Sequence, residues 1–338
     1  MSAECEAHLF IFNMLSFSEI DSIIEKSVLM LNLKGEPQEL YEPAEYMVSI
    51  GGKRLRPKMA LMTYALFSEK IDKSILNPAM GLEIFHGFTL IHDDIMDNAP
   101  LRRGMTTIHK KWDQNIAILS GDAMCIKSYE YMAECPVDLL HKVIGILTKT
   151  AIMIMEGQQY DMNFEKRPFV SMDEYITMIG LKTAVLIAAS AQIGAVIGRA
   201  PDKASDTLYD YGYQLGLAFQ IKDDYFDCFG DSSIFGKAIG GDIMCNKKTW
   251  LQTESFRRAN ATVSKKLSAI MGYADISPEE KIKEVLDIYK LLGVKEAAEE
   301  EMGSYYYKAI EALDKIPLKE EQREQLVAFA EKLVGRLF

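Results

Sequence analysis

The apolar positions of this chain recur every three or four residues over most of its length, which is the period of an amphipathic α-helix. The first such segment covers residues 16–33, where Ile20, Ile24 and Val28 fall on one side of the helix. We find no stretch of alternating apolar and polar residues, and no regular succession of strand and helix. The pattern therefore predicts an all-α fold in which long helices surround one apolar interior.

Glycine, proline and capping residues set the limits of the predicted helices. Gly35 and Pro37 end the first helix, the pair 51–52 breaks the chain after the second, and Pro100 follows the fourth. Residues 171–174 read Ser-Met-Asp-Glu, a capping box that opens a long helix. The predicted helices cover residues 16–33, 42–49, 58–67, 77–98, 116–133, 137–163, 172–196, 207–229, 278–293, 294–314 and 318–336.

The length of 338 residues alone would suggest two domains, but no linker rich in proline, glycine or serine divides the chain. We therefore expect a single domain over residues 16–338, preceded by an N-terminal extension, residues 1–15, whose role is uncertain. The extension has no basic region and no small-residue cleavage site, so we do not interpret it as a signal peptide. No apolar run reaches the length that spans a bilayer, and we expect no stable membrane insertion.

Charge and cysteine usage narrow the class of protein further. The net charge of -11 argues against binding to nucleic acid or to an anionic membrane surface. The five cysteines are an odd number without the spacing of a metal site, which favours reduced thiols and a cytoplasmic location. An acidic chain with local clusters of Lys and Arg suits an anionic ligand that is held by metal and positive charge together.

The candidate chemistry lies in an acidic pattern, DDxxD, that occurs twice. In the first copy Asp93 and Asp97 share one helical face, where like charges repel by a few tenths of a kcal/mol, roughly. The second copy runs from Asp223 to Asp227. A divalent cation would offset the repulsion, and Mg²⁺ combines carboxylate oxygens with water and substrate phosphate. One such motif alone would be no more than an acidic helix end.

Both acidic motifs come at the end of a long apolar helix and are followed by concentrated positive charge. Arg102 and Arg103 follow the first motif, whereas Lys237, Lys247 and Lys248 follow the second. Carboxylates and cations beside an apolar interior are typical of a site for a diphosphate with an apolar tail. The spacing excludes an EF-hand, and no Gly-rich phosphate loop of the Walker or Rossmann type is present.

Two further cationic features have both a bland and a functional interpretation. The turn at residues 51–56 could be a surface turn, or its Lys53 and Arg56 could hold a second diphosphate without metal. Lys182 interrupts an apolar helix, where it either extends its ammonium to solvent or, with Thr183 beside it, points at a diphosphate.

These motifs together resemble those of the trans-isoprenyl diphosphate synthases, the polyprenyl synthetase family, from about residue 40 to the C-terminus. The matching motifs are GGKRLRP at 51–57, HDDIMDNAPLRRG at 92–104, GD at 121–122, EGQQYD at 156–161, KT at 182–183, FQIKDDYFD at 219–227 and GK…GGD…NKKT between 236 and 249. The resemblance implies a single large helical bundle of the isoprenoid synthase type around a deep central cavity, and a homodimer. It also implies a Mg²⁺-dependent prenyltransferase that joins isopentenyl diphosphate head-to-tail to an allylic diphosphate.

The resemblance assigns roles to residues at the matching positions. Asp93 and Asp97 would bind two Mg²⁺ and Asp223 a third, three in all, with support from further carboxylates: Asp94, Asp224 and Asp227. The allylic diphosphate would be held by Arg102, Lys182 and Lys237. The isopentenyl diphosphate would be held by Lys53, Arg56, His86 and Arg103. Thr183 and Gln220 would place their oxygens near the developing allylic cation. Gln158 and Asp161 would line the site, and Lys247 would lie near the leaving diphosphate.

In that family a bulky aromatic residue five positions before the first aspartate blocks long products, and here this residue is Phe88. Helical geometry adds a caution, because Phe88 lies about 140° around the helix from Asp93, whereas the small Thr89 lies about 40° away. Phe88 can block the cavity only from the side, with help from Phe85. We favour geranylgeranyl diphosphate (C20) as product, with farnesyl diphosphate (C15) next.

Two other functions share parts of this pattern. A class I terpene cyclase would normally carry N/D-x-x-S/T-x-x-x-E as its second metal motif, where this chain has DDYFD. A non-catalytic subunit of a heteromeric prenyl synthase would typically lose one acidic motif, and both are intact here.

Overall fold

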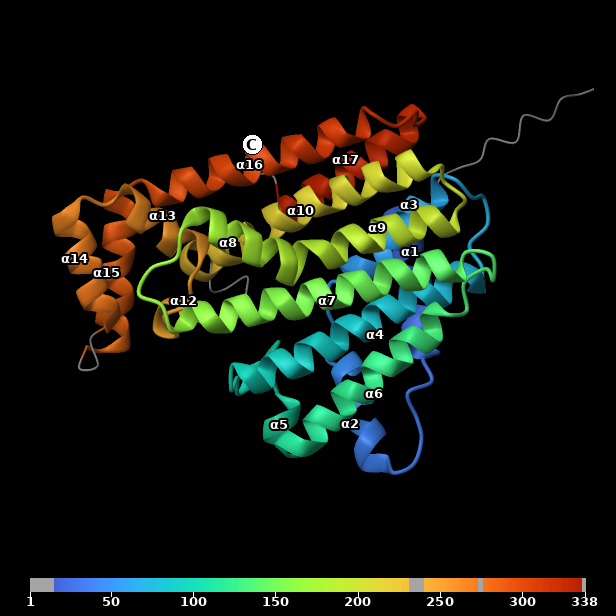
Figure 1. Ribbon diagram of the computed structural model, residues 1–338, viewed down its shortest axis with the longest axis horizontal. Helices are drawn as coiled ribbons and strands as arrows, with labels where there is room; N and C mark the ends of the chain where they lie inside the picture. The colour runs from blue at the N-terminus through green and yellow to red at the C-terminus, as the bar shows by residue number, and fades with distance from the viewer. Residues whose placement is uncertain (1–14, 231–239, 273–275, 336–338) are drawn as a thin grey trace, which may run out of the picture.

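The computed structural model describes residues 15–230, 240–272 and 276–335, and it confirms the all-α class (Figure 1). The first half of the chain forms α1 (Phe17–Leu29), α2 (Gln38–Ser49), α3 (Leu55–Ala65), α4 (Lys73–Met96), β1 (Leu101–Arg102), β2 (Met105–Thr106), α5 (Ile108–Lys111), α6 (Gln114–Met132) and α7 (Leu140–Glu165). The second half forms α8 (Met172–Ile179), η1 (Gly180–Ala184), α9 (Val185–Ile197), α10 (Asp202–Phe229), α12 (Gly241–Met244), α13 (Trp250–Arg258), α14 (Ala261–Gly272), α15 (Pro278–Leu291), α16 (Val294–Leu313) and α17 (Glu320–Val334).

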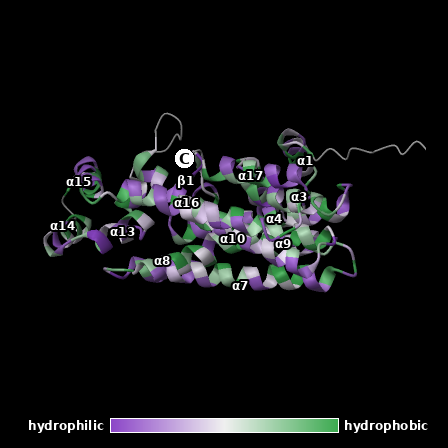
Figure 2. Cartoon of the chain, turned by 90° about the horizontal axis from the view of Figure 1, so that it is seen from above, coloured by the Kyte–Doolittle hydropathy of each residue, from purple (hydrophilic) through white to green (hydrophobic). Residues whose placement is uncertain are grey.

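The centre of the bundle is α9, in which every residue except Gln192 is buried. It packs between α3 and α10, while α16 covers α10 and α6 packs along α4. Figure 1 shows α13, α14 and α15 gathered at one end of the bundle. Hydrophobic and hydrophilic residues are interleaved along single helices, as Figure 2 shows, so each outer helix turns one face to the core. This arrangement surrounds the central helix with amphipathic neighbours.

We expected no apolar run long enough to cross a membrane, and this expectation is wrong: one helical run has the necessary length and composition. The helical run Met172–Ile197 satisfies both criteria. However, 67% of its most apolar window is buried inside the bundle, as expected for the core helix of a globular protein. Its apolar character is therefore accounted for by packing against α3 and α10.

The predicted capping box forms at the start of this run. Ser171 Oγ accepts a hydrogen bond from the Glu174 backbone N–H, and Glu174 Oε2 accepts one from the Ser171 backbone N–H at 2.9 Å. The helix is not continuous, however, because residues 180–184 form one π-helical turn. Such turns are frequent at functional sites, and this one carries Lys182 and Thr183. The apolar periodicity did not predict it.

Among the described residues between 229 and 277, the prediction missed three helices, namely α12, α13 and α14. The reason is clearest in α13, which buries the polar residues Gln252, Thr253 and Glu254 and so lacks an apolar stripe. The boundaries also shift: α3 begins at Leu55 rather than after Pro57, and α4 begins at Lys73 rather than at residue 77. Residues 1–14 of the expected extension lie outside the described ranges.

A short hairpin follows the first acidic motif and was not predicted either. Its two strands pair Leu101 with Thr106 and Arg102 with Met105. Both residues of the connecting loop, Arg103 and Gly104, have positive φ angles (52° and 77°), which suits the right-handed twist of a two-residue hairpin. The hairpin therefore places the two predicted arginines at its tip, beside the C-terminal end of α4.

Candidate active site

One large cavity, with a volume of about 1360 Å³, collects almost all of the residues that the sequence singled out. Its wall is built by the N-terminal turn of α3, by α4, the hairpin, α6, α7, η1 and α10. The predicted residues that line it are Lys53, Arg56, Phe85, His86, Phe88, Thr89, Asp93, Asp94, Asp97, Arg102, Arg103, Gln158, Lys182, Thr183, Gln220, Asp223, Asp227 and Lys247. Asp161 and Asp224 stand behind the wall, and Lys237 lies outside the described residues.

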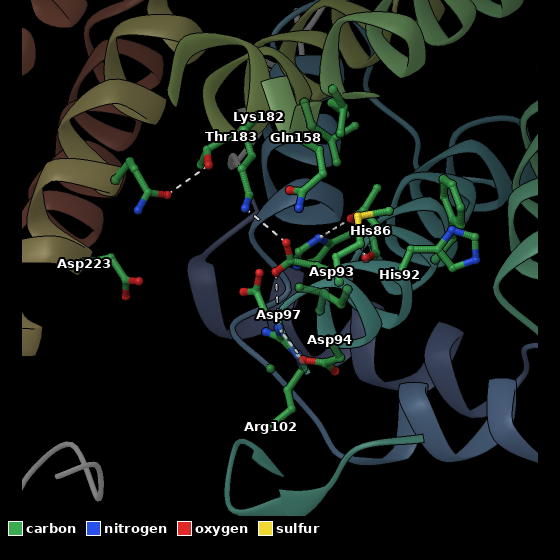
Figure 3. A pocket seen from close by; sticks show the side chains of 18 of the residues that line it. His86, His92, Asp93, Asp94, Asp97, Arg102, Gln158, Lys182, Thr183 and Asp223 are labelled. Atoms are coloured by element: carbon green, nitrogen blue, oxygen red, sulfur yellow. Dashed lines mark hydrogen bonds and ion pairs between the residues drawn. The ribbon is translucent and has the colours of Figure 1, made fainter. Parts of the chain in front are cut away.

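Two carboxylates of the first motif are paired with lysines from distant parts of the chain. Lys182 Nζ lies 3.0 Å from Asp93 Oδ1 (Figure 3). It also lies 2.6 Å from Asp161 Oδ2, and Lys247 Nζ lies 2.9 Å from Asp97 Oδ2. Burial would raise the pKa of Asp93, but the charge and hydrogen bond of Lys182 and the charges of Arg102 and Lys247 together outweigh it and hold that pKa below its usual value. Asp93 is therefore ionised, and the chain's own cations offset negative charge within the first motif.

Asp94 faces the hairpin and binds Arg102. Arg102 Nε donates to both Asp94 carboxylate oxygens, at 2.8 and 2.9 Å, while its Nη2 lies 3.5 Å from Asp93 Oδ2. Burial raises the pKa of Asp94 despite this pairing. Arg102 thus lies at the cavity wall with its guanidinium already oriented by the first motif, as a ligand for phosphate oxygens requires.

The π-turn presents Lys182 and Thr183 to the cavity. α7 approaches this turn so closely at Gly157 that a Cβ atom there would lie 2.3 Å from the backbone nitrogen of Lys182. Burial lowers the pKa of Lys182, but Asp93 and Asp161 raise it by more, so the ammonium stays protonated. Asp161 was expected to line the site, and instead it holds Lys182 from behind.

The second motif divides its aspartates between the cavity and the core. Asp223 is exposed and lies across the cavity from Asp93 and Asp97 (Figure 3). Asp227 lines the cavity and accepts a hydrogen bond from the Asp242 backbone N–H at 3.0 Å. The two acidic motifs therefore face each other from α4 and α10.

Asp224 is buried and ties three elements together. Its carboxylate accepts hydrogen bonds from Tyr175 Oη at 2.5 Å, from the Trp250 backbone N–H at 2.7 Å and from Gln220 Nε2 at 3.1 Å. Burial, together with the charge of Asp242, raises the pKa of Asp224 to about 7. Thr183 Oγ1 in turn donates to Gln220 Oε1 at 2.9 Å. This chain of hydrogen bonds fixes the side of the cavity opposite the first motif.

The carboxylates fit a metal that brings its own further ligands. Within residues 15–230, 240–272 and 276–335, no three Asp, Glu, His or Cys side chains converge into a complete metal cluster. Asp93 Oδ1 is nevertheless buried and aimed into the cavity wall, where the Lys182 ammonium, 3.0 Å away, is the cation that stands beside it. One or two protein carboxylates with water and phosphate are the donor set that Mg²⁺ takes in phosphate-binding sites. Asp93, Asp97 and Asp223 could hold it.

A second group of cations lies at the start of α3 and in the hairpin. Arg56 is buried, and burial lowers its pKa to about 10, although the charge of Glu83 opposes this. Burial and the nearby arginines, Arg56 first among them, lower the pKa of His86 well below 6.5, so its imidazole is neutral. The exposed Lys53 has its ammonium 5.3 Å from the centre of the Phe219 ring. With Arg103, these groups form a second cluster at the cavity wall that contains no aspartate.

The other end of the cavity is apolar. Phe88 is buried in an edge-on arrangement with Phe85 and with His92, at ring-centre distances of 5.3 and 4.8 Å. The lining continues with Ile126 of α6 and Met155 of α7. The site therefore combines carboxylates, two groups of cations and an apolar extension.

Sequence reasoning did not single out several residues that shape this site. Glu83 and Lys222 line the cavity, and Tyr175 anchors Asp224. A signal for Glu83 existed, since it is a lone charge within the apolar helix α4, as Lys182 is in its own helix. No comparable signal marked Tyr175, because a buried tyrosine in an apolar helix is ordinary core.

Comparisons with known proteins point in one direction. A profile described as "Polyprenyl synthetase" matches residues 37–289. The geranylgeranyl diphosphate synthase of Methanosarcina mazei is 39% identical over 244 residues, which are 71% of this chain and 74% of that protein. The geranylfarnesyl diphosphate synthase of Natronomonas pharaonis is 38% identical over 233 residues, 63% of this chain and 68% of that protein.

Solved structures agree over nearly the whole length. A crystal structure of a geranylgeranyl pyrophosphate synthase superposes with a TM-score of 0.91 at 38% identity and covers 96% of this chain and 99% of its own. The geranylgeranyl pyrophosphate synthetase of Pyrococcus horikoshii superposes with a TM-score of 0.85 at 33% identity, covering 94% and 96%. Sequence and fold thus match the same group of proteins.

Proposed function

The chain belongs to the polyprenyl synthetase family and is a prenyltransferase, and from this premise we propose that it joins isopentenyl diphosphate head-to-tail to an allylic diphosphate. The observation that carries the proposal is the cavity, in which two acidic motifs face each other, an aspartate-free group of cations lies to one side and the far end is apolar. Two diphosphates with apolar tails can be held there at different positions.

The allylic diphosphate belongs between the two acidic motifs. Mg²⁺, held by Asp93, Asp97 and Asp223 as three ions, would supply positive charge that stabilises the leaving diphosphate. Arg102, Lys182 and Lys247 already stand beside these carboxylates, and phosphate oxygens would replace the carboxylates as their partners. Lys237, outside the described residues, would join them.

The isopentenyl diphosphate belongs at the second group of cations, where Lys53, Arg56, Arg103 and the neutral His86 line the wall. Departure of the allylic diphosphate leaves a carbocation, and Thr183 and Gln220 line the wall beside it with their oxygen atoms. The apolar walls exclude water, which protects the cation from hydrolysis until the isopentenyl double bond attacks. The released diphosphate then takes the proton.

We propose a C20 product, geranylgeranyl diphosphate, with the C15 product as the alternative. Phe88 and Phe85 pack together at the apolar end of the cavity and limit the space for a growing chain. Relatives named geranylgeranyl diphosphate synthase support the C20 product. Because other relatives are named geranylfarnesyl diphosphate synthase, the effect of Phe85 and Phe88 on product length has to be tested.

We also propose that the enzyme is a homodimer in the cytoplasm. Leu119 and Ile126 of α6 and Ile152 of α7 are 58%, 70% and 52% exposed, and a second copy of the chain would cover them. The free thiols of Cys125, Cys135, Cys228 and Cys245 suit a reducing compartment.

One incubation tests the reaction. The purified chain is supplied with isopentenyl diphosphate, Mg²⁺ and in turn dimethylallyl, geranyl or farnesyl diphosphate, and the dephosphorylated products are separated by chain length. We expect linear prenyl diphosphates up to C20. Cyclic hydrocarbons from a single substrate would instead indicate a terpene cyclase, and no product with any primer would indicate a non-catalytic subunit.

A further inference from the structure

A buried ion pair lies directly behind the second group of cations. Arg54 Nη1 lies 2.7 Å from Glu83 Oε1, and both side chains are only 6% exposed. The pair connects the residue that precedes α3 with the middle of α4. Neither residue has a role in the reaction proposed above, although both line the cavity.

Arg54 stands at a strained point of the backbone. Its φ angle is 49°, in the left-handed region that a non-glycine residue rarely adopts without support from its surroundings. That support comes from the side chain, because Nη2 also donates to the Val48 carbonyl oxygen at 2.7 Å. Arg54 therefore joins the end of α2, the turn before α3 and α4. Its neighbours Lys53 and Arg56 owe their direction to this turn.

Glu83 also stabilises the positive charges of the neighbouring arginines. Its carboxylate raises the pKa of Arg56 and of Arg103 against the effect of burial and of their mutual repulsion. Oε2 of Glu83 is buried and accepts no hydrogen bond from any residue that the structure describes. A single carboxylate thus offsets part of the repulsion within the arginine group before an anion arrives.

We propose that Glu83 is a positioning residue for isopentenyl diphosphate, which fixes the left-handed turn through Arg54 and so directs Lys53 and Arg56 into the cavity. This inference rests on the proposed function for the identity of the ligand. It predicts that the loss of the Glu83 charge weakens isopentenyl diphosphate binding and leaves the allylic site, on the far side of α4's last turn, unchanged.

The test compares Glu83→Gln with a matched control in the full-length chain. Glu254→Gln removes another buried carboxylate, which pairs with Arg258 at 2.6 Å in α13 away from the cavity. Steady-state rates are measured with each substrate varied in turn, and isopentenyl diphosphate binding in EDTA is measured by calorimetry. We expect Glu83→Gln to raise the KM for isopentenyl diphosphate and the Kd in EDTA by about tenfold or more, with the allylic KM within about twofold.

A double variant guards against a misfolded single variant. Arg54→Gln/Glu83→Gln leaves no unpaired charge in the core, so it keeps the fold more readily than Glu83→Gln does. Because Glu83 acts through Arg54, the double variant should show the KM of Glu83→Gln, not the product of two separate effects. The single variant Arg54→Gln is measured as well, which completes a double-mutant cycle.

Three results would overturn the inference. They are a KM for isopentenyl diphosphate within twofold of the wild type, an equal rise in both KM values as for a general loss of structure, and multiplicative effects of the two substitutions. A wild-type chain that binds isopentenyl diphosphate in EDTA but does not turn over would instead overturn the proposed reaction. The comparison of Kd values would then still decide the role of Glu83.

Discussion

The ammonium of Lys182 lies 3.0 Å from Oδ1 of Asp93, and it is held there by Asp161 at 2.6 Å. A lysine from the π-turn thus neutralises the first acidic motif, as Lys247 does for Asp97 at 2.9 Å. The like-charge repulsion that the sequence indicated within this motif is therefore offset by the chain's own cations. Binding of metal and diphosphate can then transfer these lysines from carboxylate to phosphate, without any need for the metal in folding.

Removal of divalent metal should therefore stop turnover and leave the fold intact. In EDTA we expect no prenyl product, an unchanged helical circular dichroism spectrum and a melting temperature close to that of the untreated chain. Mg²⁺ together with inorganic diphosphate should raise the melting temperature more than either alone, because the pair binds only the folded site. A chain that unfolds in EDTA would contradict this account.

The role of Asp93 as a metal ligand predicts a large effect on rate. Asp93→Ala should lower kcat/KM for the allylic substrate by at least about a hundredfold, as expected when a group that organises transition-state charge is lost. The control is Asp210→Ala, since Asp210 is an exposed carboxylate of α10 outside the cavity wall. Retention of most activity by Asp93→Ala at saturating Mg²⁺ would count against the metal assignment.

The position of the aspartates at one cavity was predictable because their spacing can be read from the sequence, whereas their roles stay predictions. Asp93 and Asp97 fall on one helical face by spacing alone, and the structure places both at the cavity wall. The direction in which each remaining carboxylate faces was not predictable, since it depends on packing between distant elements. Asp224 shows this, because Tyr175 and Trp250, far away in the sequence, draw it into the core.

The fold class was likewise predictable from periodicity, and its exceptions have physical causes. α13 was missed because it buries polar side chains, which remove the apolar signal. The π-turn that carries Lys182 was missed because apolar periodicity contains no signal for it; in the structure the turn lies against α7 at Gly157. Glu83 could have been found by the same signal that marked Lys182, a lone charge in an apolar helix.

Phe88 should limit the length of the product. Phe88→Ala removes the ring that packs against Phe85 and His92, and so extends the apolar end of the cavity. We expect products longer than those of the wild type when the prenyl chains are separated after dephosphorylation. Phe164→Ala truncates another buried phenylalanine, outside the cavity wall, and should leave product length unchanged. If the product of Phe88→Ala has the same length as that of the wild type, Phe88 does not limit product length.

The capping box of α8 should make stability depend on pH in the acid range. Hydrogen bonds from Arg167 and Ser171 lower the pKa of Glu174 from 4.5 to about 2. Because the folded-state pKa is the lower one, the stabilisation is complete above pH 4.5 and is lost as the pH falls toward 2. The melting temperatures of the wild type and of Glu174→Gln should therefore differ most near neutral pH and converge on acidification.

The exposed Glu311 of α16 provides the control for this measurement. The difference in melting temperature between the wild type and Glu311→Gln should change little between pH 7 and pH 3, or about that range, if the capping box is the source of the effect. A difference for Glu174→Gln that grows on acidification would have the wrong sign for a carboxyl group with a lowered pKa.

The apolar faces of α6 and α7 should hold two copies of the chain together. Leu119→Glu/Ile152→Glu places a charge on each of these helices, and burial of such charges without partners opposes association. Light scattering should give twice 38.1 kDa for the wild type and 38.1 kDa for the variant. Val137→Glu is the control, because Val137 is 85% exposed but lies before α7, apart from these two faces.

The proposed dimer bears on the site because the same two helices, α6 and α7, line the cavity. Ile126 is 70% exposed and Met155 is exposed as well, yet both contribute to the apolar wall, so solvent reaches this part of the wall in the single chain. A second copy that covers them would complete the water-free environment that the carbocation needs. The monomeric variant should therefore release more of the allylic substrate as the free alcohol, measured as prenyl alcohol formed without phosphatase. A monomeric variant with the same alcohol yield as the wild type would show that one chain excludes water by itself.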